Sequence, residues 1–187
     1  MAQTAPIGRL SIAEYLASEQ RSQVKHEYAA GLVFAMAGAS ERHNRITLNI
    51  GSALLAASRG TPCIPFVADM RVRVDEVVYY PDVMVCRDPG DDDAYLKHAP
   101  CVVIEVLSES TERIDRGEKL YNYQRLASLR AYALVAQDLP RAEIYRRDND
   151  GRWLYECHDG IDAGFDLPCP PTRLTLAGIY ERIAFAP

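Results

Sequence analysis

Glu105 is the single carboxylate in an otherwise apolar run from Cys101 to Leu107, and no other residue of the chain needs a chemical explanation more. The run is rich in β-branched residues and ends at Ser108, a pattern typical of a strand that is buried on both faces. Burying an ionised carboxylate costs several kcal/mol unless a cation pairs with it. We therefore expect a cationic side chain or a metal ion opposite Glu105.

Two further residues, Asp82 before this run and Lys119 after it, have the right types to share a site with Glu105. Two carboxylates that converge at the end of a sheet repel each other, so the site either raises a pKa or collects a cation such as Mg²⁺ or Mn²⁺. A metal polarises a phosphate and activates a bound water, while a lysine stabilises developing charge or positions that water. Such a set can hydrolyse a phosphodiester. A buried network of ion pairs explains the same residues equally well.

The strands and the helix around these residues decide whether they can meet. Residues 67–74 and 77–86 are rich in β-branched residues and predict an antiparallel hairpin, in which Pro81 interrupts the ladder just before Asp82. A strand over 101–107 and a further buried strand over 131–136 follow. This order predicts an α/β (α+β) fold, with a central mixed β-sheet flanked by helices and with antiparallel hairpins.

A helix predicted over 115–127 carries the lysine. Asp115, Lys119 and Tyr123 recur in it at intervals of four residues, which places all three on one face. The chain between Glu105 and Lys119 is long enough to leave the strand, turn and run back over the strand end. The ammonium group of Lys119 could then reach the carboxylates.

The remaining elements frame this core. They are a capped helix from Ser11, a hairpin around Gly31, a long helix from Ser40 to Arg59-Gly60, a hairpin at Asp150-Gly151 and a terminal helix over 174–183. His43 lies in the first turn of the long helix and is expected near the sheet edge. A purely structural role is the more frequent one for such a histidine.

Length and composition fit one globular domain over residues 1–187, with its core at about 10–183. Of the 187 residues, 48% are hydrophobic and 25% charged, and the formal net charge is −5. This charge gives no support to a sequence-independent nucleic-acid binder. The N-terminus lacks the apolar core of a secretory signal, and no apolar run spans a bilayer, so we expect no membrane association and a cytoplasmic location.

The five cysteines are widely spaced, and none forms a CxxC motif. They are Cys63, Cys86, Cys101, Cys157 and Cys169. This pattern fits reduced, buried thiols better than a disulfide framework or a structural zinc site.

Short motifs in a fixed order, spread over about residues 10–183, resemble the Uma-type family of restriction endonucleases. None of them is specific alone, but the set is. The motifs are Glu27-Tyr28 with Gly31, Met36-Ala37-Gly38-Ala39-Ser40 with His43, Asp69 with Arg71-Val72-Arg73-Val74, Tyr80-Pro81-Asp82-Val83, Val103-Ile104-Glu105-Val106-Leu107-Ser108 with Ser110-Thr111, Asp115-Arg116-Gly117-Glu118-Lys119, Tyr123, Ser128-Leu129-Arg130 and Leu134-Val135-Ala136-Gln137-Asp138.

The family is placed in the PD-(D/E)XK nuclease superfamily, and the resemblance implies a restriction endonuclease-like fold and a DNA endonuclease that uses Mg²⁺ or Mn²⁺. Asp82 and Glu105 take the metal-binding roles by resemblance. The usual lysine position, two residues after the second acid, holds Leu107 here, so the resemblance assigns the catalytic lysine to Lys119. Where many relatives carry Asp-Gly-Glu, this chain has Ala30-Gly31-Leu32, and any function of those acids is absent.

Accessory residues are suggested less directly. Three residues on family positions are candidates to complete the site, namely His43, Glu27 and Asp115. For Asp115 an ion pair with a neighbouring arginine is the favoured interpretation, and the same holds for Asp69.

Arginine side chains match phosphate geometry, although arginines on one face of a strand are more often solvated. The candidates for phosphate contacts are Arg71, Arg73, Arg113 and Arg116.

Three functions stay open. The first is metal-dependent cleavage of DNA, for which a homodimer would address both strands of a duplex. The second is a nuclease-fold binding or interaction module that cleaves nothing. The third is a hydrolase of a small phosphorylated molecule, which the acidic net charge favours.

Overall fold

Six strands form the larger sheet of the protein, and two of its central strands lie against the predicted site. A computed structural model describes residues 9–185. The sheet has the order β11-β10-β9-β8-β6-β3. Its strands are β3 (Ile64–Val67), β6 (Val83–Cys86), β8 (Pro100–Val106), β9 (Ala131–Val135), β10 (Arg141–Arg147) and β11 (Trp153–Asp159). Because β8 and β9 pair in parallel and the other neighbours are antiparallel, the predicted mixed sheet and α+β fold class are confirmed.

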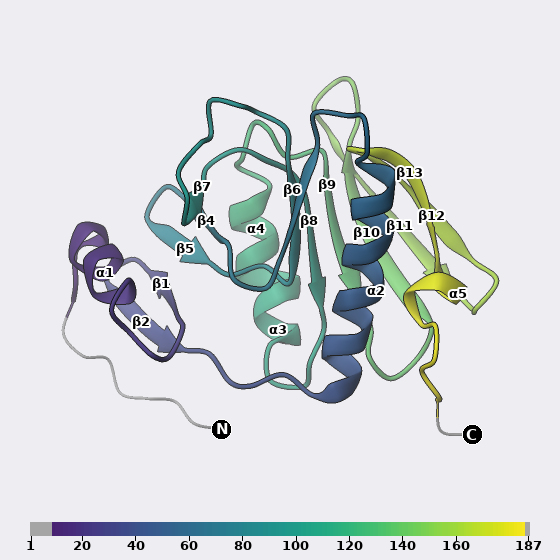
Figure 1. Ribbon diagram of the computed structural model, residues 1–187, viewed down its shortest axis with the longest axis horizontal. Helices are drawn as coiled ribbons and strands as arrows, with labels where there is room; N and C mark the ends of the chain where they lie inside the picture. Colours follow the sequence, from purple (N-terminus) through teal and green to yellow (C-terminus); the bar gives the residue numbers. More distant parts are fainter. Residues whose placement is uncertain (1–8, 186–187) are drawn as a thin grey trace.

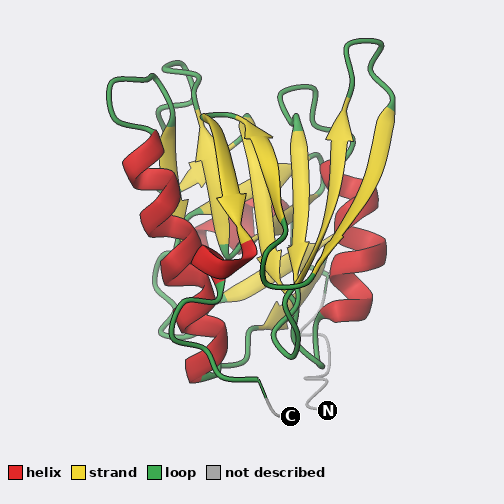
Figure 2. Ribbon diagram, turned by 90° about the vertical axis from the view of Figure 1, so that its right-hand side faces the viewer, coloured by secondary structure: helices red, strands yellow, loops and turns green. Residues whose placement is uncertain are grey.

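Strand β8 is buried along its whole length, as its apolar sequence predicted. Val102 and Ile104 pack in one hydrophobic cluster with Ile46 and Ile50 of the long helix α2 (Glu41–Ala57). Side chains alternate across a strand, so Glu105 points to the opposite face, where Val103 packs with Tyr123 and Tyr132. Figure 2 shows helices on both faces of the sheet.

The predicted antiparallel hairpin over 67–86 is wrong in one respect, because its two long strands are divided between two sheets. Residues 71–74 and 77–79 form β4 (Arg71–Val74) and β5 (Val77–Tyr79) of the second sheet, whereas β3 and β6 pair in the first. The chain changes sheets at Ala68, which has a φ of 66°, and again at Pro81. Asp82 therefore lies at the junction between the sheets, immediately before β6.

The helix predicted over 115–127 is also built differently. It consists of α3 (Glu112–Ile114), a wider π-helical turn η1 (Asp115–Lys119) and α4 (Leu120–Tyr123). A π turn inserts an extra residue into the helical repeat, a feature that propensity does not reveal and that is frequent at functional sites. Asp115, Lys119 and Tyr123 still reach the same buried face.

The smaller five-stranded sheet lies beside this core and has the order β2-β1-β5-β4-β7. Its remaining strands are β1 (His26–Ala29), β2 (Leu32–Ala35) and β7 (Leu96–Lys97). Helix α1 (Ile12–Glu19) begins at the predicted cap, Ser11, and packs Tyr15 against Tyr28 and Val78 of the sheet. In Figure 1, α1, β1 and β2 lie together at one end of the molecule.

The C-terminal part corrects two predictions. A hairpin of β12 (Gly164–Pro168) and β13 (Pro171–Thr175), followed by the short helix α5 (Leu176–Ile179), replaces the single helix predicted over 174–183. The turn of this hairpin brings Cys169 to Cys101 of β8, and the two form a disulfide. The prediction that all cysteines are reduced is therefore wrong for this pair, because only tertiary packing joins residues so far apart in sequence. Cys63, Cys86 and Cys157 are free.

Among the described residues, no helix has the length and apolar character needed to cross a bilayer.

Candidate active site

Glu105 lies at the end of β8 with only 3% of its surface exposed, and three donors surround its carboxylate. Oε1 accepts hydrogen bonds from Lys119 Nζ at 3.2 Å and from Tyr123 Oη at 3.1 Å. Oε2 accepts a hydrogen bond from the backbone N–H of Asp82 at 3.1 Å. The expected cation opposite Glu105 is therefore Lys119 in this structure.

Asp82 lies where the chain enters β6, and its carboxylate is positioned by β8 and α2. Its Oδ2 accepts a hydrogen bond from the backbone N–H of Val106 at 2.8 Å and lies 3.1 Å from Nε2 of His43. His43 is held in the first turn of α2, which Ser40 caps. Burial opposes the charged form of His43, but the hydrogen bond and charge of Asp82 outweigh it and raise the pKa of His43.

Lys119 is the centre of the acidic cluster, which we define as Glu27, Asp82, Glu105 and Asp115. Nζ of Lys119 lies 3.0 Å from Oε1 of Glu27, 3.2 Å from Oε1 of Glu105 and 3.2 Å from Oδ1 of Asp115. Its side chain is 6% exposed. The structure therefore brings the predicted residues Asp82, Glu105 and Lys119 together, and Glu27, His43 and Asp115 join them.

The electrostatics of the cluster follow from burial and an excess of negative charge. Desolvation raises the pKa of Glu105 well above its ordinary value, and the nearby Asp115, Asp82 and Glu27 add to that rise, while Lys119 opposes it. Desolvation also disfavours the ammonium of Lys119, but its carboxylate neighbours outweigh that cost and raise its pKa. Lys119 is therefore held in its charged form.

Asp115 was expected to pair with an arginine, and that prediction is wrong because its partner is Lys119, one turn further along the helix. Oδ1 of Asp115 is buried and has no hydrogen-bond partner among the described residues, because the contact with the lysine lacks hydrogen-bond geometry. Asp69, for which the same pairing was favoured, forms its ion pair with Lys25.

Two tyrosines belong to the site although the sequence assigned them no role. Tyr123 donates to Glu105, and the signal for it was present, since it shares a helical face with Asp115 and Lys119. Tyr79 lies with its ring 5.5 Å from Nζ of Lys119 and accepts a hydrogen bond from Asn122. No sequence pattern distinguishes Tyr79 from an ordinary core tyrosine.

The four arginines predicted to contact phosphate lie in different surroundings. Arg116 forms ion pairs with Glu112 and Glu143, and Arg113 is exposed. Arg73 donates to the backbone carbonyl of Asp75 in the β4–β5 turn. Arg71 is 5% exposed and lines a separate pocket beside the acidic cluster.

Comparison with solved structures shows the fold. A chain titled "Crystal structure of a putative nuclease belonging to DUF820 from Anabaena variabilis ATCC 29413" superimposes with a TM-score of 0.75 at 17% identity, covering 91% of this chain and 97% of that chain.

Sequence relatives extend over nearly the whole chain. "Uncharacterized protein slr1290" of Synechocystis sp. is 34% identical over 186 residues, which is 97% of each chain. "Uncharacterized protein sll1609" of the same organism is 34% identical over 150 residues, covering 78% of this chain and 85% of that protein. Residues 12–162 match the family Uma2, described as "Putative restriction endonuclease", which supports a nuclease-type function. The chain belongs to the family Uma2.

Proposed function

We propose that the protein is a metal-dependent endonuclease that hydrolyses phosphodiester bonds in DNA. The observation that carries this proposal is the acidic cluster itself, in which four carboxylates meet around Lys119 and His43. Carboxylates outnumber cationic side chains there, and such an excess of buried negative charge is relieved by protonation or by a bound cation.

The donor chemistry of Asp82 and Glu105 fits Mg²⁺ or Mn²⁺. Asp82 uses Oδ2 for both of its contacts, so Oδ1 carries no hydrogen bond from the described residues, and its side chain is 21% exposed. Within residues 9–185, no group of three or more His, Cys, Asp or Glu side chains is arranged to hold a metal. Mg²⁺ suits such a site because it commonly uses one or two carboxylates and completes its shell with water and substrate phosphate.

When bound, the metal would supply a Lewis acid for the phosphate and would lower the pKa of a water. Lys119 would hold a positive charge beside the scissile phosphate, where it stabilises developing negative charge. It is an electrostatic group rather than a general base, because its neighbours keep it protonated. Tyr123 and the backbone N–H of Asp82 fix the orientation of the Glu105 carboxylate.

A second function, a binding module that cleaves nothing, is favoured by the way Lys119 is already paired with three carboxylates. In such a network the lysine compensates part of the carboxylate charge without a metal. The acidic net charge of −5 likewise keeps open the hydrolysis of a small phosphorylated molecule.

A cleavage panel separates these functions. Duplex DNA, single-stranded DNA, RNA and a small phosphodiester are incubated with the protein and Mg²⁺ or Mn²⁺, and again with EDTA. We expect metal-dependent cuts within DNA by the wild type and by Asp166→Asn, a control in β12 distant in sequence from the cluster, but none by Glu105→Gln. Cleavage of the small phosphodiester alone supports the third function, and intact substrates throughout support the binding module.

We also propose that the active form is a homodimer, because a two-fold pair of sites can address both strands of a duplex. Sedimentation of the protein with and without DNA tests this. A species of twice the 20.9 kDa chain mass supports the dimer, and a monomer in both conditions contradicts it.

A further inference from the structure

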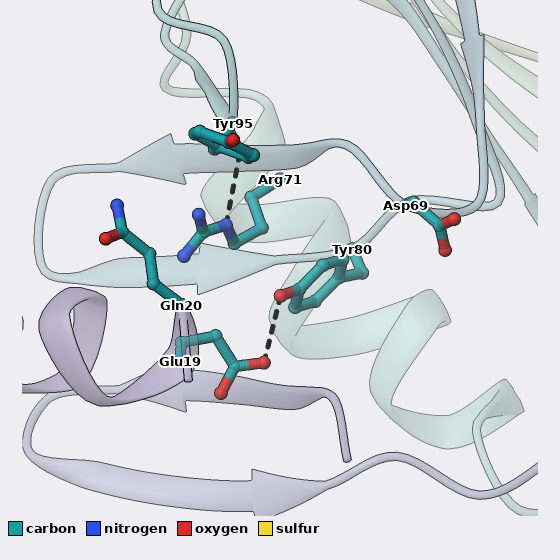
Figure 3. A pocket seen from close by; sticks show the side chains of 6 residues that line it. All are labelled: Glu19, Gln20, Asp69, Arg71, Tyr80 and Tyr95. Atoms are coloured by element: carbon teal, nitrogen blue, oxygen red, sulfur yellow. Dashed lines mark hydrogen bonds between the residues drawn. The ribbon is translucent and has the colours of Figure 1, made fainter. Parts of the chain in front are cut away.

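A pocket of about 320 Å³ lies between α1 and the five-stranded sheet, separate from the carboxylates that surround Lys119. Its lining residues are Glu19, Gln20, Asp69, Arg71, Tyr80 and Tyr95, shown in Figure 3. The pocket adjoins the acidic cluster, because Tyr80 stands two residues before Asp82 and its backbone N–H donates to Glu27 at 3.3 Å. Its volume is at the lower end of the roughly 300–1,000 Å³ of small-molecule sites and suits a single base or nucleoside.

Arg71 supplies unsatisfied donors to this pocket. Its Nε donates to the backbone carbonyl of Tyr95 at 3.1 Å, which fixes the plane of the guanidinium. Nη1 is buried and has no hydrogen-bond partner within residues 9–185. In Figure 3 the guanidinium lies between Tyr95, Gln20 and Glu19. A buried donor without an acceptor costs free energy, and a ligand whose acceptor atoms reach the guanidinium of Arg71 after a small shift that opens Nη1 would relieve that cost.

The same pocket also presents acceptors. The Glu19 carboxylate is buried, and its Oε1 accepts from the backbone N–H of His26 at 2.8 Å and from the Tyr80 hydroxyl at 2.9 Å. Its Oε2 lies 3.0 Å from Nδ1 of His26 and keeps a further lone pair for a ligand. Asp69 adds a second carboxylate, which pairs with Lys25. A phosphate carries acceptors and negative charge only and would be repelled by both carboxylates. A planar ligand with acceptors on one edge and donors on another matches this arrangement.

Aromatic surface completes the lining. Tyr95 is 63% exposed, whereas Tyr80 is 7% exposed and Nζ of Lys25 lies 5.9 Å from the centre of its ring. Tyr95 is therefore the ring of this lining that is open to a ligand (Figure 3). Tyrosine rings provide stacking surfaces for unpaired nucleic-acid bases.

We propose that this pocket binds a guanine base of the nucleic-acid substrate and that Arg71 reads it. Arginine pairs with O6 and N7 of guanine, and the carboxylates of Glu19 and Asp69 can accept from its N1–H and exocyclic amino group. Adenine presents a donor at the position of O6 and would oppose Arg71. The inference rests on the proposed function and adds a base preference to it, and it assigns Arg71 to a base rather than to a phosphate.

The test measures nucleotide binding by the full chain in EDTA, so that no cleavage is required. GMP, IMP, AMP and CMP share a phosphate group and differ in their bases. We expect GMP to bind at least about tenfold more tightly than AMP or CMP, with IMP between them because it lacks the amino group. Arg71→Lys should abolish this preference, while Arg141→Lys, which alters a partly exposed arginine of β10, should retain it.

A second variant protects the test against misfolding, because Arg71 is buried. Tyr95→Ala changes an exposed side chain. It should weaken the binding of all four nucleotides and leave the circular dichroism spectrum unchanged. Equal affinity for the four nucleotides, or competition by inorganic phosphate as strong as that by GMP, would overturn the guanine assignment. A protein that prefers GMP but cuts no DNA supports this inference and refutes the cleavage proposal. A protein that cuts DNA but shows no preference for GMP supports the cleavage proposal and refutes this inference.

Discussion

Lys119 is the residue on which the acidic cluster converges, and its charge balances part of what Glu27, Glu105 and Asp115 bring into the interior. An ion pair buried in this way contributes little net stability, but removing one partner leaves the others uncompensated. The same lysine therefore supports both the fold and the proposed chemistry.

Replacement of Lys119 by methionine keeps much of the side-chain volume and removes the cation. In EDTA we expect the free energy of unfolding to fall by about 3–5 kcal/mol, because three carboxylates lose their partner. Urea denaturation checks this, with Lys25→Met, which removes a half-exposed lysine paired with Asp69, as the matched control. A Lys119→Met protein as stable as the wild type would show that the carboxylates do not depend on the lysine.

The buried thiol of Cys86 should lower the free energy of unfolding at alkaline pH. Burial, and to a smaller extent the charge of Asp91, raise the pKa of its thiol to about 12, whereas an unfolded thiol ionises near 8.5. The folded state thus keeps the proton where the unfolded chain loses it. This contribution is complete below about pH 8.5 and is lost as the pH rises toward 12.

Urea unfolding at about pH 7.5 and about pH 9.0, where most of the unfolded thiol is ionised but most tyrosines keep their proton, measures the effect. The decrease in stability should be smaller in Cys86→Ala and unchanged in Cys157→Ala, whose thiol is exposed in the wild type. An identical decrease in all three proteins would contradict the assignment to Cys86.

At the scale of elements, α2 and the segment α3–η1–α4 bring their polar residues to one end of β8 from opposite faces of the sheet. Ser40 starts α2 by accepting a hydrogen bond from the backbone N–H of His43, the residue that contacts Asp82. The N-cap of α2 therefore holds the residue that contacts Asp82.

Ser40→Ala should lower the free energy of unfolding by about 1 kcal/mol, the usual cost of a lost N-cap. Ser52→Ala, at an exposed position inside the same helix, is the control and should have little effect. Thermal unfolding of the two variants compares them directly. If both behave alike, the cap does not anchor this helix.

The sequence predicted these elements where local pattern determines them. The apolar strand around Glu105, the Ser40 cap and the face shared by Lys119 and Tyr123 are all local features, and the structure has them. It could not predict the π turn at 115–119, because an extra residue in a helical repeat depends on what the turn packs against. The division of the 67–86 hairpin between two sheets could not be predicted either, because it depends on which distant strands each half pairs with.

At the scale of the whole molecule, the chain passes from one sheet to the other at Asp82, and the other site residues come from elements around that junction. Glu27 comes from the smaller sheet, Glu105 from the larger one and Lys119 from the helical segment that covers it. Their types and spacing along the chain predicted that these residues meet, but not the partner of each carboxylate. The Cys101–Cys169 disulfide was missed for a similar reason, since a hairpin distant in sequence delivers Cys169.

Binding of Mn²⁺, followed by electron paramagnetic resonance, tests most directly whether Asp82 and Glu105 hold a divalent cation. We predict one Mn²⁺ per chain in the wild type and in Asp166→Asn, displaced by excess Mg²⁺, and none in Asp82→Asn/Glu105→Gln with circular dichroism unchanged. A wild type that binds no Mn²⁺, or a double variant that binds it as tightly, would contradict the metal site.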